Sequence, residues 1–195
     1  MPAARRGCIG QFAGCATVLI IVAVVLYAVD AILIAPWAHG DGPVLTRTWV
    51  GAFQSPGGHR GVLELTLQHG FRRRGFATGY RGRGLLAGTA RSCGLVDWPA
   101  YDLTGTADRS ASDVSVVIGV PHPAPAGLYL HELRGAWSGD SLRLSGVLAA
   151  YAGTTNSYHG GAIDENQPTH VTLHPGTDAD FDQACRAAGL VTGRR

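Results

Sequence analysis

The sequence predicts a mainly β protein: one N-terminal transmembrane helix, then an antiparallel β-barrel or β-sandwich of about eight strands, and a short C-terminal helix. Three observations support this prediction. Residues 12–37 form an apolar stretch in which Asp30 is the only charged residue. Beyond residue 44, short segments alternate apolar and polar residues and are separated by turns rich in Gly and Pro. Residues 178–188 show the pattern of an amphipathic helix.

The apolar stretch is long enough to cross a bilayer, which takes about 20 helical residues. It lacks the regularly spaced polar residues of a helix on the surface of a soluble protein. A carboxylate at the bilayer centre costs about 2.5 to 3.5 kcal/mol. Asp30 lies near the distal end, where we expect it to reach the interface, with protonation or contact with a partner helix as the alternatives. Trp37 is expected in the aromatic belt at the membrane surface.

The charges beside the stretch predict its orientation. Arg5 and Arg6 precede it in a tail without acidic residues, and the first charged residue after it is Asp41. The positive-inside rule therefore places the N-terminus in the cytoplasm and the β domain across the cytoplasmic (inner) membrane, in the periplasm or outside the cell. A cleaved signal peptide is the alternative, but its apolar core has only about 7 to 15 residues. The predicted parts are a cytoplasmic tail 1–11, a signal anchor 12–37, a linker 38–43, a β domain 44–190 and a tail 191–195.

The composition limits the choice of partners. The chain has 195 residues and a formal net charge of +2, which is too small to favour nucleic acid. All 16 basic residues are Arg, a bias that we attribute to a GC-rich bacterial genome rather than to guanidinium chemistry. The length beyond the anchor suffices for one domain.

The clearest predicted strand is 61–68, where Leu63, Leu65 and Leu67 alternate with polar residues, as in an antiparallel sheet with one wet face. The glycine of Ser138-Gly139-Asp140 predicts a tight hairpin, because it adopts the positive φ that such turns need. The other expected strands are 49–54, 84–90, 101–107, 113–120, 127–135, 141–150 and 169–174.

The C-terminal helix is expected to be capped by Thr177 or Asp178 and to end at Gly189. Its inner face carries Cys185. Cys93 is the other cysteine of the predicted external domain. Because an oxidising compartment favours disulfides, we expect Cys93 and Cys185 to be bonded, two separate buried thiols being the alternative.

The densest charge lies between the second and third predicted strands, where Arg72, Arg73, Arg74, Arg81 and Arg83 are interleaved with aromatic residues and glycines. Guanidinium groups match the geometry of phosphates and carboxylates. Outside the cytoplasm, the segment predicts contact with an anionic envelope component. A solvated hairpin loop is the alternative.

A second candidate is the long segment 151–167, rich in Gly, Thr, Asn and Tyr, in which Tyr158 and His159 are predicted ligand-binding residues. No catalytic residue, cofactor or metal site is predicted. The chain has no Gly-x-Ser-x-Gly motif. His170 and His174 would lie about 13 Å apart on a strand, too far to share one ion.

The first predicted strand opens with Trp49, Val50 and Gly51, which together with residues 135–140 resemble the Trp-containing openings of lipocalins, small ligand-binding barrels. Arg47 stands where the lipocalin pattern has Gly, so no membership and no site is inferred from the resemblance.

These observations predict a single-pass membrane protein whose external β domain binds an anionic envelope component, a partner protein or another membrane protein, without catalysis. The alternative is an exported enzyme of the hydrolase type that acts on cell-envelope material. An enzyme would gather two or more titratable side chains with perturbed pKa values in one cleft, which separates the two hypotheses.

Overall fold

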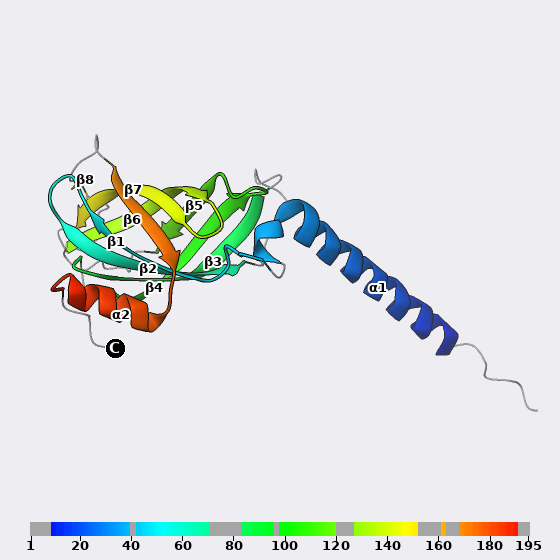
Figure 1. Ribbon diagram of the computed structural model, residues 1–195. Coiled ribbons are helices and arrows are strands. Elements are labelled where there is room, and N and C mark those ends of the chain that lie inside the picture. The colour runs from blue at the N-terminus through cyan, green and yellow to red at the C-terminus, as the bar shows by residue number, and fades with distance from the viewer. Residues whose placement is uncertain are drawn as a thin grey trace, which may run out of the picture.

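The structure is a computed structural model that describes residues 9–39, 42–70, 83–95, 98–119, 127–151, 161–162 and 168–190 (Figure 1). Helix α1 (Ile9–Val29) is followed by a π-helical turn (Asp30–Ile34) and a short 3-10 helix (Pro36–Ala38). The strands are β1 (Thr48–Gln54), β2 (Arg60–His69), β3 (Arg83–Cys93), β4 (Trp98–Asp108), β5 (Val114–Ile118), β6 (Gly127–Trp137), β7 (Leu142–Tyr151), β8 (Gly161–Ala162) and β9 (Thr169–Pro175), and helix α2 (Asp178–Ala187) comes last.

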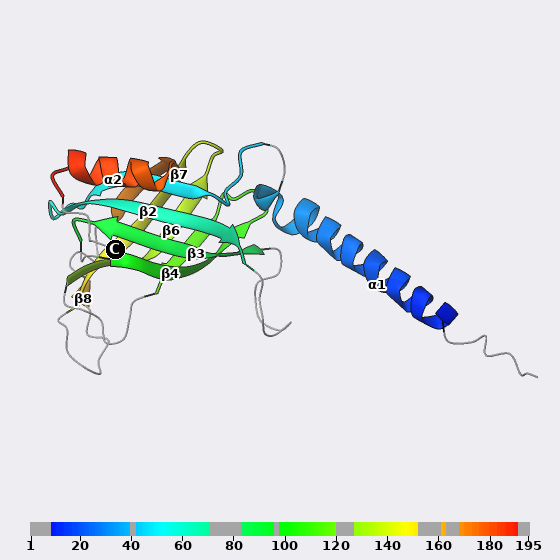
Figure 2. The same cartoon turned by 90° about the horizontal axis from the view of Figure 1, so that it is seen from below.

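Strands β1 to β6 follow one another around a barrel as antiparallel neighbours. Strand β7 pairs with β6 and β9, and β9 pairs with β1 to close the ring (Figure 1, Figure 2). The predicted barrel or sandwich is therefore an eight-stranded antiparallel barrel, and all eight predicted segments overlap its strands. The unpredicted strand β8 lies outside this ring of eight and pairs with the end of β7.

The predicted hairpin between β6 and β7 is confirmed. Trp137 pairs with Leu142 across it, and Gly139 has a φ of +79°. The Trp137 indole N–H donates to the carbonyl oxygen of Gly139 at 3.1 Å, which holds the turn against the end of β6.

The barrel interior is filled with side chains from all eight strands of the ring. Trp49 and Tyr129 are the largest of them and are fully buried. The buried residues of this cluster are at most 6% exposed. These side chains pack against one another in one cluster and fill the part of the interior that they line. The interior of an eight-stranded barrel is just wide enough for such filling.

Helix α2 lies on the outside of the barrel, across β1 and β2 (Figure 2). It begins with the predicted cap on Thr177, whose hydroxyl oxygen accepts from the Asp180 N–H while the Asp180 carboxylate accepts from the Thr177 N–H. Phe181 and Cys185 are buried against the barrel wall. Cys93 and Cys185 form a disulfide with an S–S distance of 2.07 Å, which confirms the predicted pairing.

An ion pair reinforces the same contact. Arg91 on β3 donates to both carboxylate oxygens of Glu64 on β2, at 2.7 and 2.6 Å. Its guanidinium also lies 3.3 Å from an Asp178 oxygen and 4.7 Å from the Phe181 ring centroid. The Glu64 side chain is only 4% exposed, and a charge buried this far is tolerated because it is paired.

Helix α1 extends away from one end of the barrel (Figure 1). Its span Cys15–Leu33 is long and apolar enough to cross a membrane, and none of it is buried. The chain after it enters the barrel at once. Ala35 and Trp37 are buried in the barrel core, and the Trp37 indole N–H donates to the Asp108 carbonyl oxygen at 2.9 Å. The expectation that Trp37 lies in the aromatic belt is therefore wrong, because its indole closes the end of the barrel.

The segment predicted as a linker, residues 38–43, lies between two residues of the barrel core. Trp37 before it and Leu45 after it are both buried in the core, and the Leu45 N–H donates to the Trp37 carbonyl oxygen at 2.9 Å. Helix α1 and the first core residue, Ala35, are consequently separated only by the π-helical turn.

Candidate functional site

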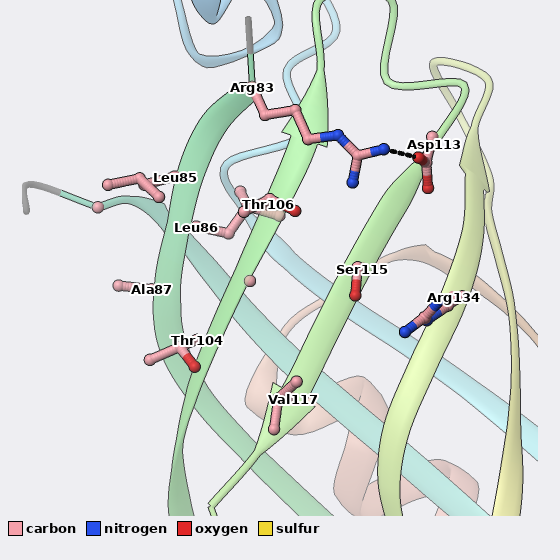
Figure 3. Close-up of a pocket in the computed structure, with 12 residues that line it drawn as sticks. Arg83, Leu85, Leu86, Ala87, Thr104, Thr106, Asp113, Ser115, Val117 and Arg134 are labelled. Carbon is pink, nitrogen blue, oxygen red and sulfur yellow. Dashed lines mark hydrogen bonds and ion pairs between the residues drawn. The ribbon is translucent and has the colours of Figure 1, made fainter. Parts of the chain in front are cut away.

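A groove of about 610 Å³ runs over the outer face of β3, β4, β5 and β6 (Figure 3). Its middle is lined by short side chains: Ala87 on β3, Thr104 and Thr106 on β4, and Ser115 and Val117 on β5. Short side chains leave room for a ligand to approach the sheet, and the three hydroxyl groups can donate or accept hydrogen bonds. The groove therefore suits a polar ligand that lies across several strands.

Two ion pairs flank the groove. Arg83 and Asp113 pair at the end nearest α1, where their side chains point toward one another (Figure 3). Arg134 pairs with Glu132 on its own strand, with its Nε 3.0 Å from Glu132 Oε1. The Arg83 and Arg134 side chains are 41% and 71% exposed, so their remaining N–H groups are open to an anion.

The Arg-rich segment is attached to this groove at both ends. Gly70, directly before it, and Arg83, at its end, are both lining residues. Of the predicted ligand-binding residues, only Arg83 belongs to the part of the chain that the structure describes. The others, which fall outside it, are Arg72, Arg73, Arg74, Arg81, Tyr158 and His159.

Sequence reasoning missed the other groove residues. Thr104, Ser115 and Arg134 each occupy outward positions of a predicted strand, which the alternation of polar and apolar residues could have indicated. The alternation within each strand does not show that these residues are neighbours. That depends on the register between strands, which places Thr106 beside Ser115 and Ser115 beside Arg134.

A second depression of about 420 Å³ adjoins the groove on β6 and β7. Glu132 and Arg134 line it together with Ser145 and Val147. Arg134 lines both depressions and is therefore a candidate contact for a ligand in either one.

Three polar side chains meet at the junction of α1 and the barrel. Asp30 opens the π-helical turn, His39 follows the 3-10 helix, and His69 is the last residue of β2. The Nε2 atoms of His39 and His69 lie 3.5 and 3.4 Å from the same oxygen, Asp30 Oδ2. None of the expectations for Asp30 from the sequence involved His39 or His69. Only the folded chain brings the three residues together.

Asp108 organises the turn between β4 and β5 at the groove end nearest α1. Burial opposes ionisation of its carboxyl group, but hydrogen bonds from the Ser112 hydroxyl, the Asp113 N–H and the Ser110 hydroxyl outweigh burial and lower the pKa of Asp108. The carboxylate therefore stabilises the turn whenever it is ionised.

We expect Asp108→Asn to cost about 1 kcal/mol of unfolding free energy at pH 7, because charge-assisted hydrogen bonds to the turn are weakened. A lowered pKa stabilises the folded state above the ordinary Asp pKa of about 3.9, and this contribution is lost as the pH falls through the folded-state value. Urea unfolding of both proteins at pH 7 and pH 3 measures the effect. An equal difference at the two pH values would contradict this role of the carboxylate.

Comparisons of the chain with protein-family models, with curated proteins and with solved structures find no match.

Proposed function

We propose that the chain is a single-pass protein of the bacterial cytoplasmic membrane that binds an anionic envelope component in the groove over β3 to β6. Helix α1 is then a signal anchor with its N-terminus in the cytoplasm, and the barrel lies in the periplasm or outside the cell. Arg5 and Arg6 before the span support this orientation. The bonded pair Cys93 and Cys185 fits an oxidising compartment.

The observation that carries the proposal is the contrast between the filled interior and the open outer face. The interior residues of the cluster are at most 6% exposed, whereas the outer groove measures about 610 Å³. This contrast supports binding on the outer face of the described part of the barrel, unlike in a hollow ligand-carrying barrel.

The charges in the groove favour binding over catalysis. Arg83 and Arg134 pair with Asp113 and Glu132, and guanidinium groups stay charged throughout the physiological pH range. Such groups hold phosphates or carboxylates but do not transfer protons. Gly70 and Arg83, on either side of the Arg-rich segment, line the same groove, and Arg72, Arg73, Arg74 and Arg81 lie between them in the sequence.

Photocrosslinking of the full chain in bacterial membranes tests the proposal. A benzophenone amino acid at Thr104, which lines the groove, is expected to capture a component that carries phosphate or carboxylate, identified by mass spectrometry. The same amino acid at the exposed Thr172 on β9 is the control. The double variant Arg83→Gln and Arg134→Gln is expected to lower the yield about tenfold or more, because each lost charged contact weakens binding.

Arg60→Gln is the matched charge control, since Arg60 is exposed and lies at the opposite end of β2 from His69. It should leave the yield unchanged. Equal capture from Thr104 and Thr172 would rule out the groove as the binding site. Capture of a protein at Thr104, insensitive to the arginine variants, would favour a partner protein over an anionic envelope component.

A further inference from the structure

We propose that Asp30, His39 and His69 bind one divalent transition-metal ion of the Zn²⁺ class, which clamps the end of the membrane helix to the barrel. The proposal does not depend on the groove or its ligand. It starts from the distances between three side chains that come from separate segments of the chain, namely the π-helical turn after α1, the segment after the 3-10 helix and the end of β2.

The distances fit metal ligands better than hydrogen bonds. Hydrogen bonds between charged nitrogen and oxygen groups measure about 2.7 to 2.9 Å. The two imidazole nitrogens lie 3.4 and 3.5 Å from Asp30 Oδ2, and the buried His39 Nε2 has no hydrogen-bond partner. With bonds of about 2.0 to 2.1 Å, neighbouring ligands of a tetrahedral Zn²⁺ ion are about 3.3 to 3.4 Å apart. The carboxylate oxygen is therefore already at ligand spacing from each imidazole.

The two imidazole nitrogens are also close to one another. All three ligand atoms lie within 4.8 Å of one another, so the two imidazole nitrogens need to approach by at most about 1.5 Å to reach tetrahedral spacing. The proposal requires the two rings to turn about their side-chain bonds by this amount.

Aromatic neighbours hold the two imidazole rings in place. The His39 ring contacts the Tyr27 ring edge to face at a centroid distance of 5.3 Å, and it contacts the His69 ring at 5.5 Å. The His69 ring lies against Trp37 at 6.0 Å. The ligands are thus partly oriented by packing, which reduces the ordering that an ion would have to impose.

The donor set selects the class of ion. Two imidazoles and one carboxylate suit Zn²⁺, Co²⁺, Ni²⁺ or Cu²⁺, whereas Ca²⁺ and Mg²⁺ prefer oxygen donors. The side chains of Asp30, His39 and His69 are 30%, 25% and 16% exposed, so an ion can enter and a water molecule can complete its coordination. A π-helical turn, such as the one that begins at Asp30, is frequently found at functional sites.

Metal binding by the full chain without a polyhistidine tag, in detergent micelles, tests the proposal. Equilibrium dialysis with Zn²⁺ is expected to give about one ion per chain, and Co²⁺ is expected to give the visible absorption of a tetrahedral nitrogen and oxygen site. Asp30→Asn and His69→Ala should each weaken Zn²⁺ binding about tenfold or more, because each removes a ligand. His174→Ala removes an exposed histidine from β9 and should change nothing.

Thermal unfolding gives an independent readout. Zn²⁺ should raise the unfolding temperature of the wild-type chain and of His174→Ala, but not that of Asp30→Asn, because a ligand stabilises only the state that binds it. Asp30→Asn preserves side-chain size. If His69→Ala does not fold, Asp30→Asn alone shows whether loss of a ligand abolishes the stabilisation by Zn²⁺. Absence of Zn²⁺ binding by the wild-type chain would overturn the proposal, as would equal losses in His174→Ala and Asp30→Asn. A cobalt spectrum dominated by thiolate bands would also overturn it, since it would place the ion on the cysteines of the anchor region.

Discussion

Replacing Cys93 and Cys185 together by alanine is expected to lower the free energy of unfolding by about 4 to 5 kcal/mol. The two cysteines are separated by 92 positions in the sequence, and a bond that closes a loop of this size greatly restricts the unfolded chain. A loss of this size is a large part of the total stability of a domain, which is typically about 5 to 15 kcal/mol. Urea unfolding of the full chain in micelles measures it.

The free Cys15 provides the control for this experiment. It is exposed on α1, and Cys15→Ala should leave the unfolding midpoint unchanged. In the double variant, helix α2 should lose amide protection before the barrel does, because it packs on the outside of β1 and β2 and not within the core. Coincident unfolding curves for the oxidised protein and the double variant would show that the disulfide contributes nothing measurable.

Trp37→Ala is expected to cost about 3 to 5 kcal/mol, the range for removing a large buried aromatic side chain. The Trp37 side chain is 3% exposed and lies directly over Gly84, where an added Cβ would come within 2.5 Å of the indole. The variant also removes the hydrogen bond to the Asp108 carbonyl. The end of the barrel would then be open beside the anchor, and denaturant unfolding together with proteolysis near residue 45 would report the change.

Trp137→Ala is the matched control for Trp37→Ala. Trp137 is also a tryptophan with an indole N–H donated to a backbone carbonyl, but it lies half-buried at the β6 and β7 hairpin. Its loss should cost clearly less than that of Trp37. If the two variants were equally stable, or if Trp37→Ala cost less than about 1 kcal/mol, Trp37 would not be the residue that closes the barrel.

The strands could be predicted because one face of each meets the core. The alternation of Leu63, Leu65 and Leu67 with polar residues, for example, corresponds to an interior face and a wall that faces water or α2. The closure of the ring could not be predicted in the same way. It depends on the pairing of β1 with β9, which are far apart in the sequence, and alternation within a strand does not specify its neighbour.

Hydropathy alone does not separate the apolar helix from the barrel core. A membrane-spanning helix and a barrel core are both apolar, so the hydropathy of residues 12–37 does not show that Ala35 and Trp37 belong to the core. Hydropathy also does not predict the cluster of Asp30, His39 and His69. The sequence predicts only that Asp30 is a residue of the membrane span whose carboxylate is costly to bury. In the folded chain, His39 and His69 lie within 3.5 Å of this carboxylate.

The direct passage from α1 into the barrel limits how far the protein can reach. The longest strands have 11 residues, which at about 3.3 Å per residue corresponds to at most about 36 Å. In the proposed membrane topology no spacer lengthens the tether, so the barrel would sample only a layer of about this depth above the lipid. Encounters with the proposed ligand would then depend on lateral diffusion in the plane of the membrane, and polymers held farther from the bilayer would be out of range.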